Sequence, residues 1–238
     1  LSREAKLFVN VIDASHLEPN LYLSVQLREM GVPVLVALNM MDVARKRGIK
    51  VDVKSLSQTL DCPIVPVVAV TGEGMDDLKH EIDLFVSAAD AAAGNNETIN
   101  DFQVVHEDTV EQALTSIQAL LTTPHMRRNS RWYAMKLLEN DSHALAQVNE
   151  PCQALVTQWQ EKIEDQTGED ADIHIADARY SHAHTLAQGA LKDTGKLNRT
   201  LSDRIDNLVL HKLAGIPIFL FLMYLMFMFT INIGSAFI

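Results

Sequence analysis

An asparagine and an aspartate stand three positions apart where an apolar run ends, at Asn39 and Asp42 in VLVALNMMD. A carboxylate accepts hydrogen bonds from two adjacent donors at once, and guanine presents such a pair, its N1 proton and its 2-amino group. Adenine has an acceptor at N1 and no 2-amino group, so Asp42 is suited to select guanine. The amide of Asn39 is suited to reach the N7 side of the base and to tie neighbouring loops together. Asn and Asp after a strand also serve as turn and cap formers, and that alternative stays open.

A second segment, AVTGEG at residues 69–74, ends a later apolar run. Gly72 and Gly74 permit a tight turn there, because glycine adopts backbone conformations that other residues avoid. We expect exposed backbone N–H groups of this turn to meet the O6 atom of a guanine.

Three apolar runs rich in β-branched residues must position these segments, at residues 6–14, 32–39 and 62–70. Stretches with helical spacing separate them, and this alternation predicts a parallel sheet covered on both faces. Ligands of such sheets bind outside the carboxyl ends of the strands, which is where Asn39 lies. Residues 1 to about 90 are therefore expected to form part of an α/β domain.

Each helix between or after the runs has an apolar stripe that we expect to face the sheet. Asn20 is expected to cap the first helix and Gly31 to mark its end. The stripes are Leu23, Leu27 and Met30 in the first helix, Leu56 and Leu60 in the second, and Met75, Leu78, Ile82 and Phe85 in the third. Asp13, at the end of the first run, is interpreted as a structural turn residue.

The amino-acid composition changes at residues 91–100, AAAGNNETIN. Gly and Asn interrupt a run of alanines there, and clusters of β-branched residues become less frequent after it. This change predicts a domain boundary. From there to about residue 195 we expect mainly helices, near 104–121, 132–138, 151–166 and 170–191. A small helical domain is therefore expected to follow the sheet.

The last 26 residues, 213–238, carry no charge and include IPIFLFLMYLMFMF. About 20 apolar residues span a bilayer as a helix, so we expect a transmembrane helix here, with a buried core helix as the alternative. Short segments rich in Lys and Arg stay on the cytoplasmic side. Lys192, Lys196, Arg199, Arg204 and Lys212 precede the run, so residues 1–212 are expected to be cytoplasmic.

Composition limits the remaining possibilities. A net charge of −11 disfavours binding to nucleic-acid phosphates. The two cysteines, Cys62 and Cys152, have no spacing of a zinc site or disulfide framework, which fits a reducing compartment. We expect the histidines, including His106, His182 and His184, and the carboxylates of residues 161–172 to be solvated. The sequence predicts no metal site.

Several segments resemble known proteins. Residues 39–42, NMMD, resemble the fourth guanine-specificity motif of small G proteins, usually NKxD, and Ala69, Val70 and Thr71 are similar to the fifth. Met40 replaces the common Lys and leaves an unbranched stem to lie along the purine face. The NMxD form, together with residues 10–42, ADARY at 176–180 and residues 215–227, resembles the ferrous iron transport protein B (FeoB) family over nearly the whole chain.

The resemblance implies an internal piece of a longer protein. Its fold class is α/β, a partial P-loop GTPase-like parallel sheet with flanking helices, followed by a small all-α domain and one transmembrane helix. The implied domains are the C-terminal part of a G domain at 1–92, a helical spacer (GDI-like) domain at 93–196, a juxtamembrane segment at 197–212 and a first transmembrane helix at 213–238. The implied guanine-binding residues are Asn39, Met40, Asp42, Ala69, Val70 and Thr71, with no catalytic residue in this stretch.

The resemblance also implies a function: uptake of Fe²⁺ across the bacterial inner membrane, gated or driven by GTP binding and hydrolysis. The implied partners are Fe²⁺, the lipid bilayer, small Feo accessory proteins and a second copy of the chain. Mg²⁺ would bind through residues missing here, because the 238 residues contain no GxxxxGK[ST] loop, and their α/β part, residues 1 to about 90, contains no DxxG. The stretch alone is therefore expected to be inactive as a GTPase. A membrane-tethered G-protein switch that carries no ion, and a soluble GTPase whose last helix is core, are the alternatives.

Overall fold

The computed structural model describes residues 6–91, 102–192 and 215–236. The chain divides into two compact units, residues 1–193 and 194–238. The strands and helices of the first half of unit 1 are β1 (Phe8–Asp13), the 3-10 helix η1 (Ala14–His16), α1 (Leu17–Glu29), β2 (Val34–Asn39), α2 (Met41–Lys46), β3 (Lys50–Val51), α3 (Val53–Leu60), β4 (Ile64–Pro66) and α4 (Met75–Ala91). Those of its second half are α5 (Asp108–Leu120), α6 (Pro124–Arg128), α7 (Ser130–Leu138), α8 (Ser142–Leu145), α9 (Glu150–Thr167), α10 (Ala171–Ala190) and β5 (Leu191–Lys192).

The three main strands form a parallel sheet in the order β1-β2-β4. Side chains alternate along the central strand: Val34, Val36 and Leu38 belong to one buried cluster, and Leu35 and Ala37 to another. Successive residues of a strand point to opposite faces, so a strand buried on both sides reads as a continuous apolar run. The predicted parallel sheet covered on both faces is confirmed.

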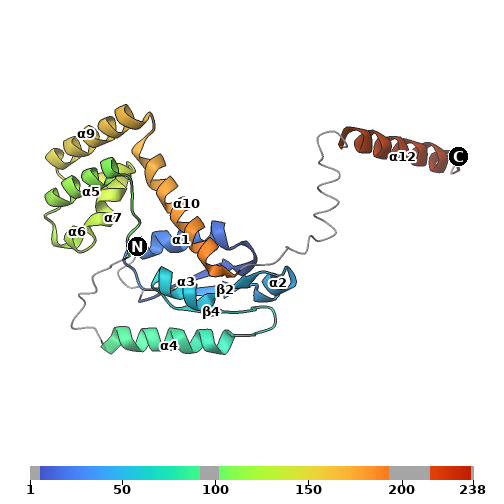
Figure 1. Ribbon diagram of the computed structural model, residues 1–238, viewed down its shortest axis with the longest axis horizontal. Coiled ribbons are helices and arrows are strands. Elements are labelled where there is room, and N and C mark those ends of the chain that lie inside the picture. The colour runs from blue at the N-terminus through green and yellow to red at the C-terminus, as the bar shows by residue number, and fades with distance from the viewer. Residues whose placement is uncertain (1–5, 92–101, 193–214, 237–238) are drawn as a thin grey trace. The chain divides into compact units, whose positions relative to one another are not determined.

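Helices cover the two faces of the sheet, and their apolar side chains face it. Leu56 and Leu60 of α3 are buried in the cluster that also holds α1, as predicted. On the other face, Leu78 of α4 is buried against β2 and β4, with Met75, Ile82 and Phe85 packed around it, also as predicted. Figure 1 shows α4 on the opposite side of the sheet from α1.

The expected cap of the first helix is wrong. Asn20 lies inside α1, where its Nδ2 atom donates to the carbonyl oxygen of His16 at 2.7 Å. The helix begins earlier because Asp13, the expected turn residue, accepts a hydrogen bond from the amide of Ser15 at 2.7 Å and starts η1, which leads directly into α1. This side-chain bond to the backbone two residues on is a common way to start a turn.

The buried face of α1 differs in part from the predicted one, although Leu27 packs against the core as expected. Leu21 and Val25 are fully buried, whereas Leu23 is 50% exposed. The earlier start of the helix does not change which residues share a face. The face that packs against the sheet is the neighbouring one, which carries the i, i+4 pair Leu21 and Val25. Gly31 follows the helix with a φ of 67°, in the left-handed region expected after a helix end.

The four predicted helices of the second domain are confirmed as α5, α7, α9 and α10, with a shared buried core. Two short helices, α6 and α8, were not predicted. Asp141 starts α8, because its Oδ1 atom accepts from the amides of His143 and Ala144, both at 3.0 Å. The segment in which the domain boundary was placed, 91–100, lies almost entirely outside the described residues.

One helix belongs to both cores. Ala171 and Ile175, near the start of α10, are buried in the helical core, whereas Ala183 and Leu186 are buried with the sheet domain. Directly after α10, β5 pairs with β3 in a small antiparallel sheet. The helical domain is therefore packed onto the sheet domain through its last helix.

Unit 2 contains α12 (Gly215–Ala236), whose described side chains are mostly exposed, including those of Phe219, Phe221 and Phe227. Among the described residues no helix meets the length and apolar character required to cross a membrane. The transmembrane helix predicted at 213–238 is thus not found; its residues 213, 214, 237 and 238 and the basic residues at 196–212 lie outside the described residues.

Candidate functional site

The candidate site lies at the carboxyl edge of the sheet. Asp13 and Asn39, the last residues of β1 and β2, stand opposite each other in register. The Oδ1 atom of Asn39 accepts a hydrogen bond from the amide of Ala69 at 3.1 Å, which joins two segments 30 residues apart. The amide of Val67 also donates to the carbonyl oxygen of Leu38 at 2.8 Å. The sequence-predicted segments 39–42 and 69–74 are therefore brought together, with Asn39 as the tie expected of it.

The helix that follows Asn39 starts with a strained residue. Met40 has a φ of 60° and a ψ of 31°, in the left-handed region, and precedes α2 without a side-chain cap. Such a conformation costs about 1–3 kcal/mol for a residue other than glycine and is concentrated at functional sites. It turns the chain sharply, so that α2 begins at once and its first turn carries Asp42.

Asp42 is accessible. Its side chain is 39% exposed, and one carboxylate oxygen lies 3.7 Å from the Nζ atom of Lys46, one helical turn later. An exposed pair of this spacing is weak and exchanges with water or ligand. Met40 is 45% exposed and Val70 is 98% exposed. Two apolar side chains and a carboxylate thus border the same edge, and together they offer a hydrogen-bond acceptor and an apolar surface that fit a purine base.

Several backbone amides of the loop at residues 69–74 already donate hydrogen bonds within the protein. The N–H of Ala69, expected to contact the base, donates to Asn39. The amides of Thr71 and Gly72 both donate to the carbonyl oxygen of Val68, at 3.1 and 2.9 Å. In this arrangement Ala69 supports the site through Asn39, and Val70 is the residue of the loop that the turn leaves most open to a ligand.

Glycine is required in this loop, as predicted. Gly72 and Gly74 have φ values of 80° and 76°. A Cβ atom on Gly74 would lie 2.2 Å from the carbonyl oxygen of Pro66. Any side chain at Gly74 would therefore push the loop away from the end of β4.

Sequence reasoning missed a second link between the two segments. Arg45 of α2 forms an ion pair with Glu73 of the 69–74 loop. The two residues are 28 positions apart, and nothing in their spacing marks them as partners. At the start of α1, the ring of His16 lies between Asp13 and Arg47, each 3.1 Å from one of its nitrogens.

The expected solvation of the histidines is wrong for His106. It is 6% exposed, and neither ring nitrogen has a hydrogen-bond partner in the described part of the chain. Burial, with a smaller contribution from the Arg131 guanidinium, lowers the pKa of His106 to about 4. Burial also lowers the pKa of His182. Across residues 6–91, 102–192 and 215–236, no three His, Cys, Asp or Glu side chains gather closely enough to hold a metal ion.

Two family models match the chain. The model described as "Ferrous iron transport protein B" matches residues 1–82, and that described as "FeoB cytosolic helical domain" matches residues 106–192. The Fe(2+) transporter FeoB of Salmonella typhimurium is 38% identical over 238 residues. That match covers 99% of this chain and 29% of the relative, so the chain spans under a third of the length of the curated relatives that it matches.

Solved structures agree in fold. NFeoB from S. thermophilus, bound to mGMPPNP, is 32% identical with a TM-score of 0.64; the match covers 82% of this chain and 71% of that one. The cytosolic domain of L. pneumophila FeoB is 29% identical with a TM-score of 0.63, covering 80% of this chain and 69% of that one. Both the sheet domain and the helical domain therefore have counterparts in one family. The chain belongs to the FeoB family of ferrous iron transport protein B.

Proposed function

We propose that the carboxyl edge of the sheet binds the guanine base of GTP or GDP. Asp42 accepts from the N1 proton and the 2-amino group, while the Nδ2 atom of Asn39 donates to N7. Met40 lies along the purine face, and the exposed backbone of Val70 donates to O6. Ala69 and Thr71 hold the loop in place.

One observation carries this proposal: the Asn39–Ala69 hydrogen bond, which brings the two segments onto one edge beside an exposed Asp42. It uses the acceptor end of the Asn39 amide, so the donor end is the one that can serve the base. The similarity to an NFeoB structure bound to mGMPPNP supports the same ligand class.

For the whole protein we propose GTP-dependent uptake of Fe²⁺ across the bacterial inner membrane. The chain belongs to a family whose curated relatives are named Fe(2+) transporter. Residues 1–92 would be the C-terminal part of the G domain, and residues 93–196 a helical spacer through which nucleotide state is relayed. Both would lie on the cytosolic side, where GTP is found. Phosphate and Mg²⁺ binding would require a P-loop and switch residues that these 238 residues do not contain, so they would not hydrolyse GTP alone.

The test is the variant Asp42→Asn in the full-length protein. The new amide presents N–H donors to the two donors of guanine, so GDP affinity should fall by about 2–4 kcal/mol, roughly 30- to 1,000-fold. Xanthosine diphosphate carries a 2-oxo acceptor instead of the 2-amino group, and its relative affinity should rise. Isothermal titration with both nucleotides measures the two changes.

Asp61→Asn is the matched control. Asp61 ends α3 in the left-handed region, which Asn tolerates, and its side chain is 74% exposed. The control should bind GDP and xanthosine diphosphate as the unchanged protein does. If Asp42→Asn left both affinities at the control values, the assignment of Asp42 to the base would be rejected.

A further inference from the structure

Cations gather on one part of the sheet domain, although the chain as a whole is acidic. In a chain of net charge −11, residues 45–54, RKRGIKVDVK, hold five cations and one carboxylate. These cations lie at the end of α2, on β3 and in the first turn of α3, and all five are exposed. The basic patch consists of Arg45, Lys46, Arg47, Lys50 and Lys54.

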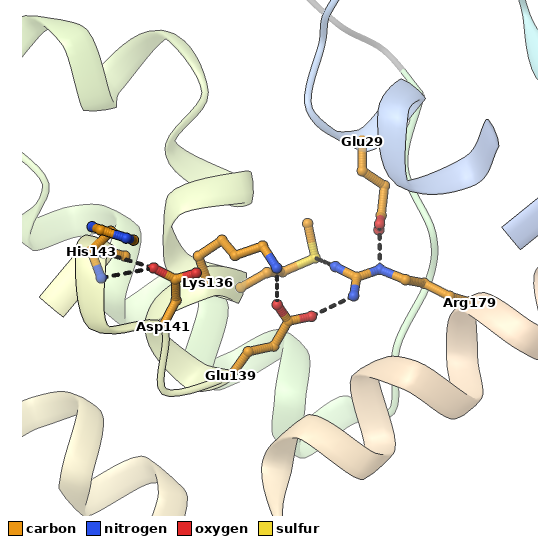
Figure 2. A network of polar contacts seen from close by, with 8 residues as sticks. Glu29, Lys136, Glu139, Asp141, His143 and Arg179 are labelled. Carbon is orange, nitrogen blue, oxygen red and sulfur yellow. Dashed lines mark hydrogen bonds and ion pairs between the residues drawn. The ribbon is translucent and has the colours of Figure 1, made fainter. Parts of the chain in front are cut away.

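Buried cations of this protein are neutralised by nearby carboxylates. Figure 2 shows Arg179 between Glu29 and Glu139, with Lys136 reaching Glu139 from the other side. Two cations and two carboxylates balance one another there. Such a cluster has no charge left over for a partner.

The basic patch is not balanced in this way. Neither Lys50 nor Lys54 has an ion-pair partner in the part of the chain that the structure describes. Lys46 has one distant carboxylate, that of Asp42 at 3.7 Å, and its side chain is 79% exposed. The patch therefore keeps positive charge that an anionic partner can neutralise.

The basic patch lies next to the point at which residues 193–214 begin. Strands β3 and β5 pair antiparallel, with Lys50 opposite Lys192 in register. The amide of Asp52 also donates to the carbonyl oxygen of Ala190 at 2.7 Å. The segment that follows β5 leads to α12 and adds four more basic residues, Lys196, Arg199, Arg204 and Lys212.

The apolar helix at the end of this segment distinguishes between anionic partners. The side chains of α12 are apolar and mostly exposed, for example Phe219 and Phe227. An anionic bilayer offers phosphate groups to clustered Lys and Arg and an apolar layer to such a helix. A nucleic acid offers phosphates but no apolar layer, and the acidic remainder of the chain repels it.

We propose that the basic patch docks on the anionic phospholipid headgroups of the membrane from which this chain extends. The inference rests on the proposed place of the chain on the cytosolic side of the bacterial inner membrane. Contact at the patch holds the α2–β3 side of the sheet domain against the bilayer. The attraction is between exposed charges, so salt weakens it.

The test is lysine footprinting of the full-length protein in lipid nanodiscs. One set of nanodiscs contains phosphatidylcholine alone, and the other contains about 30% phosphatidylglycerol, a source of surface charge. Formaldehyde with dimethylamine borane methylates accessible lysines, and mass spectrometry gives the rate at each one. These reagents are uncharged, so the anionic surface does not repel them. Saturating GDP keeps the candidate base site in one state in all samples.

Methylation of Lys46, Lys50 and Lys54 should slow by about fivefold in the anionic nanodiscs, the gain expected for one cation near such a surface. Lys79 of α4, which is 69% exposed, is the internal reference. Its rate should agree within about twofold between the two sets, because a lysine away from the bilayer lies beyond the screening length.

The test variant is Lys50→Gln with Lys54→Gln, which removes two exposed cations and no described ion pair. Protection of Lys46 in the anionic nanodiscs should then fall to about twofold or less. The matched control, Lys79→Gln with Lys162→Gln, removes the same charge from exposed positions of α4 and α9 and should keep the full protection. Both variants should bind GDP as the unchanged protein does.

Two further conditions separate the possible causes of protection. In 1 M salt the difference between the two sets of nanodiscs should disappear. Inorganic phosphate added to the phosphatidylcholine nanodiscs should give no protection; protection equal to that of the anionic lipid would show a site for free anions and overturn the lipid assignment. Equal lysine rates in both sets at low salt would also overturn it. If the rates were equal while Asp42→Asn still weakened GDP binding, the proposed function would stand and this inference alone would fail.

Discussion

Charged pairs in the two regions of this molecule differ in their surroundings. At the carboxyl edge of the sheet, Arg45 and Glu73 link the two candidate base loops with side chains that are 56% and 53% exposed. Between the sheet domain and the helical domain, Arg179 and Glu29 meet with side chains that are 2% and 1% exposed. Water screens the first pair and is excluded from the second.

The difference separates adaptable from fixed parts of the fold. Exposed pairs contribute little and can rearrange when a ligand arrives. A buried pair cannot lose one partner without leaving a charge in an apolar interior, so it holds its helices in one arrangement. A nucleotide site needs loops that open and close, supported from behind by elements that do not.

The largest effect is expected from Arg179→Met alone. It leaves the carboxylate of Glu29 buried without its guanidinium, which should lower the free energy of unfolding by about 3–5 kcal/mol at pH 7.5. Because burial already raises the pKa of Glu29, part of this loss should be regained as the pH falls and Glu29 takes up a proton. Urea unfolding at several pH values measures both effects.

The control for this loss is Arg131→Met, whose side chain is 22% exposed and whose partner Glu111 is 31% exposed. This substitution should lower the free energy of unfolding less, by about 1–2 kcal/mol, because water can solvate the remaining carboxylate of Glu111. Adding Glu29→Gln to Arg179→Met should restore more than half of the lost stability. Equal losses for Arg179 and Arg131 would show that burial does not distinguish the two pairs.

A smaller, pH-dependent effect is expected from His106. Its pKa of about 4 in the folded chain is below its ordinary 6.5, mainly through burial. The folded state therefore binds fewer protons than the unfolded state between these values, and stability that is full above pH 6.5 is lost as the pH falls toward 4. The loss between pH 7.5 and pH 5 should be about 1–2 kcal/mol.

His106→Leu should abolish this loss without lowering stability at pH 7.5, since neither ring nitrogen has a hydrogen-bond partner among the described residues. Urea unfolding followed by the fluorescence of Trp132 and Trp159, which both pack on the helical core, reports on the right domain. His80→Leu, at an exposed position of α4, is the matched control and should keep the unchanged pH dependence. An identical pH dependence in the His106 variant would refute the assignment.

Local signals explain how much could be predicted from the sequence. The strands β1, β2 and β4, the helices α3 and α4 and the four predicted helices of the second domain follow from apolar spacing within ten to twenty residues, whereas the two-residue strands β3 and β5 do not. The Asn39 tie and the glycine turn were also visible, because each is set by residues next to a strand end. The cap of α1 failed because Asp13 starts the helix through η1, and competing caps a few residues apart cannot be ranked from sequence alone.

Ion pairs between residues far apart in the sequence could not be predicted from local spacing. Glu29 and Arg179 are 150 residues apart, and Arg45 and Glu73 are 28 apart. One signal could have pointed to the first pair: Arg179 stands on the stripe formed by Ile175 and Ala183, one turn before and one turn after it, and an arginine on a buried helix face requires a partner. Nothing comparable marks Arg45, because an exposed arginine needs no partner.

The smallest effect is expected from Arg45→Gln at the base loops. Its ion pair with Glu73 is exposed on both sides, and the Asn39–Ala69 bond already ties the same two segments. GDP affinity should therefore change by less than about threefold, and the change should disappear in 1 M salt, where charges are screened beyond about 3 Å. Asn39→Ala, which removes the tie itself, should weaken GDP binding far more and at both salt concentrations. Titrations of both variants at low and high salt decide the matter. A tenfold or greater loss for Arg45→Gln that persists in high salt would mean that nucleotide binding buries this pair too, and the contrast between an adaptable edge and a fixed junction would then hold only for the free protein.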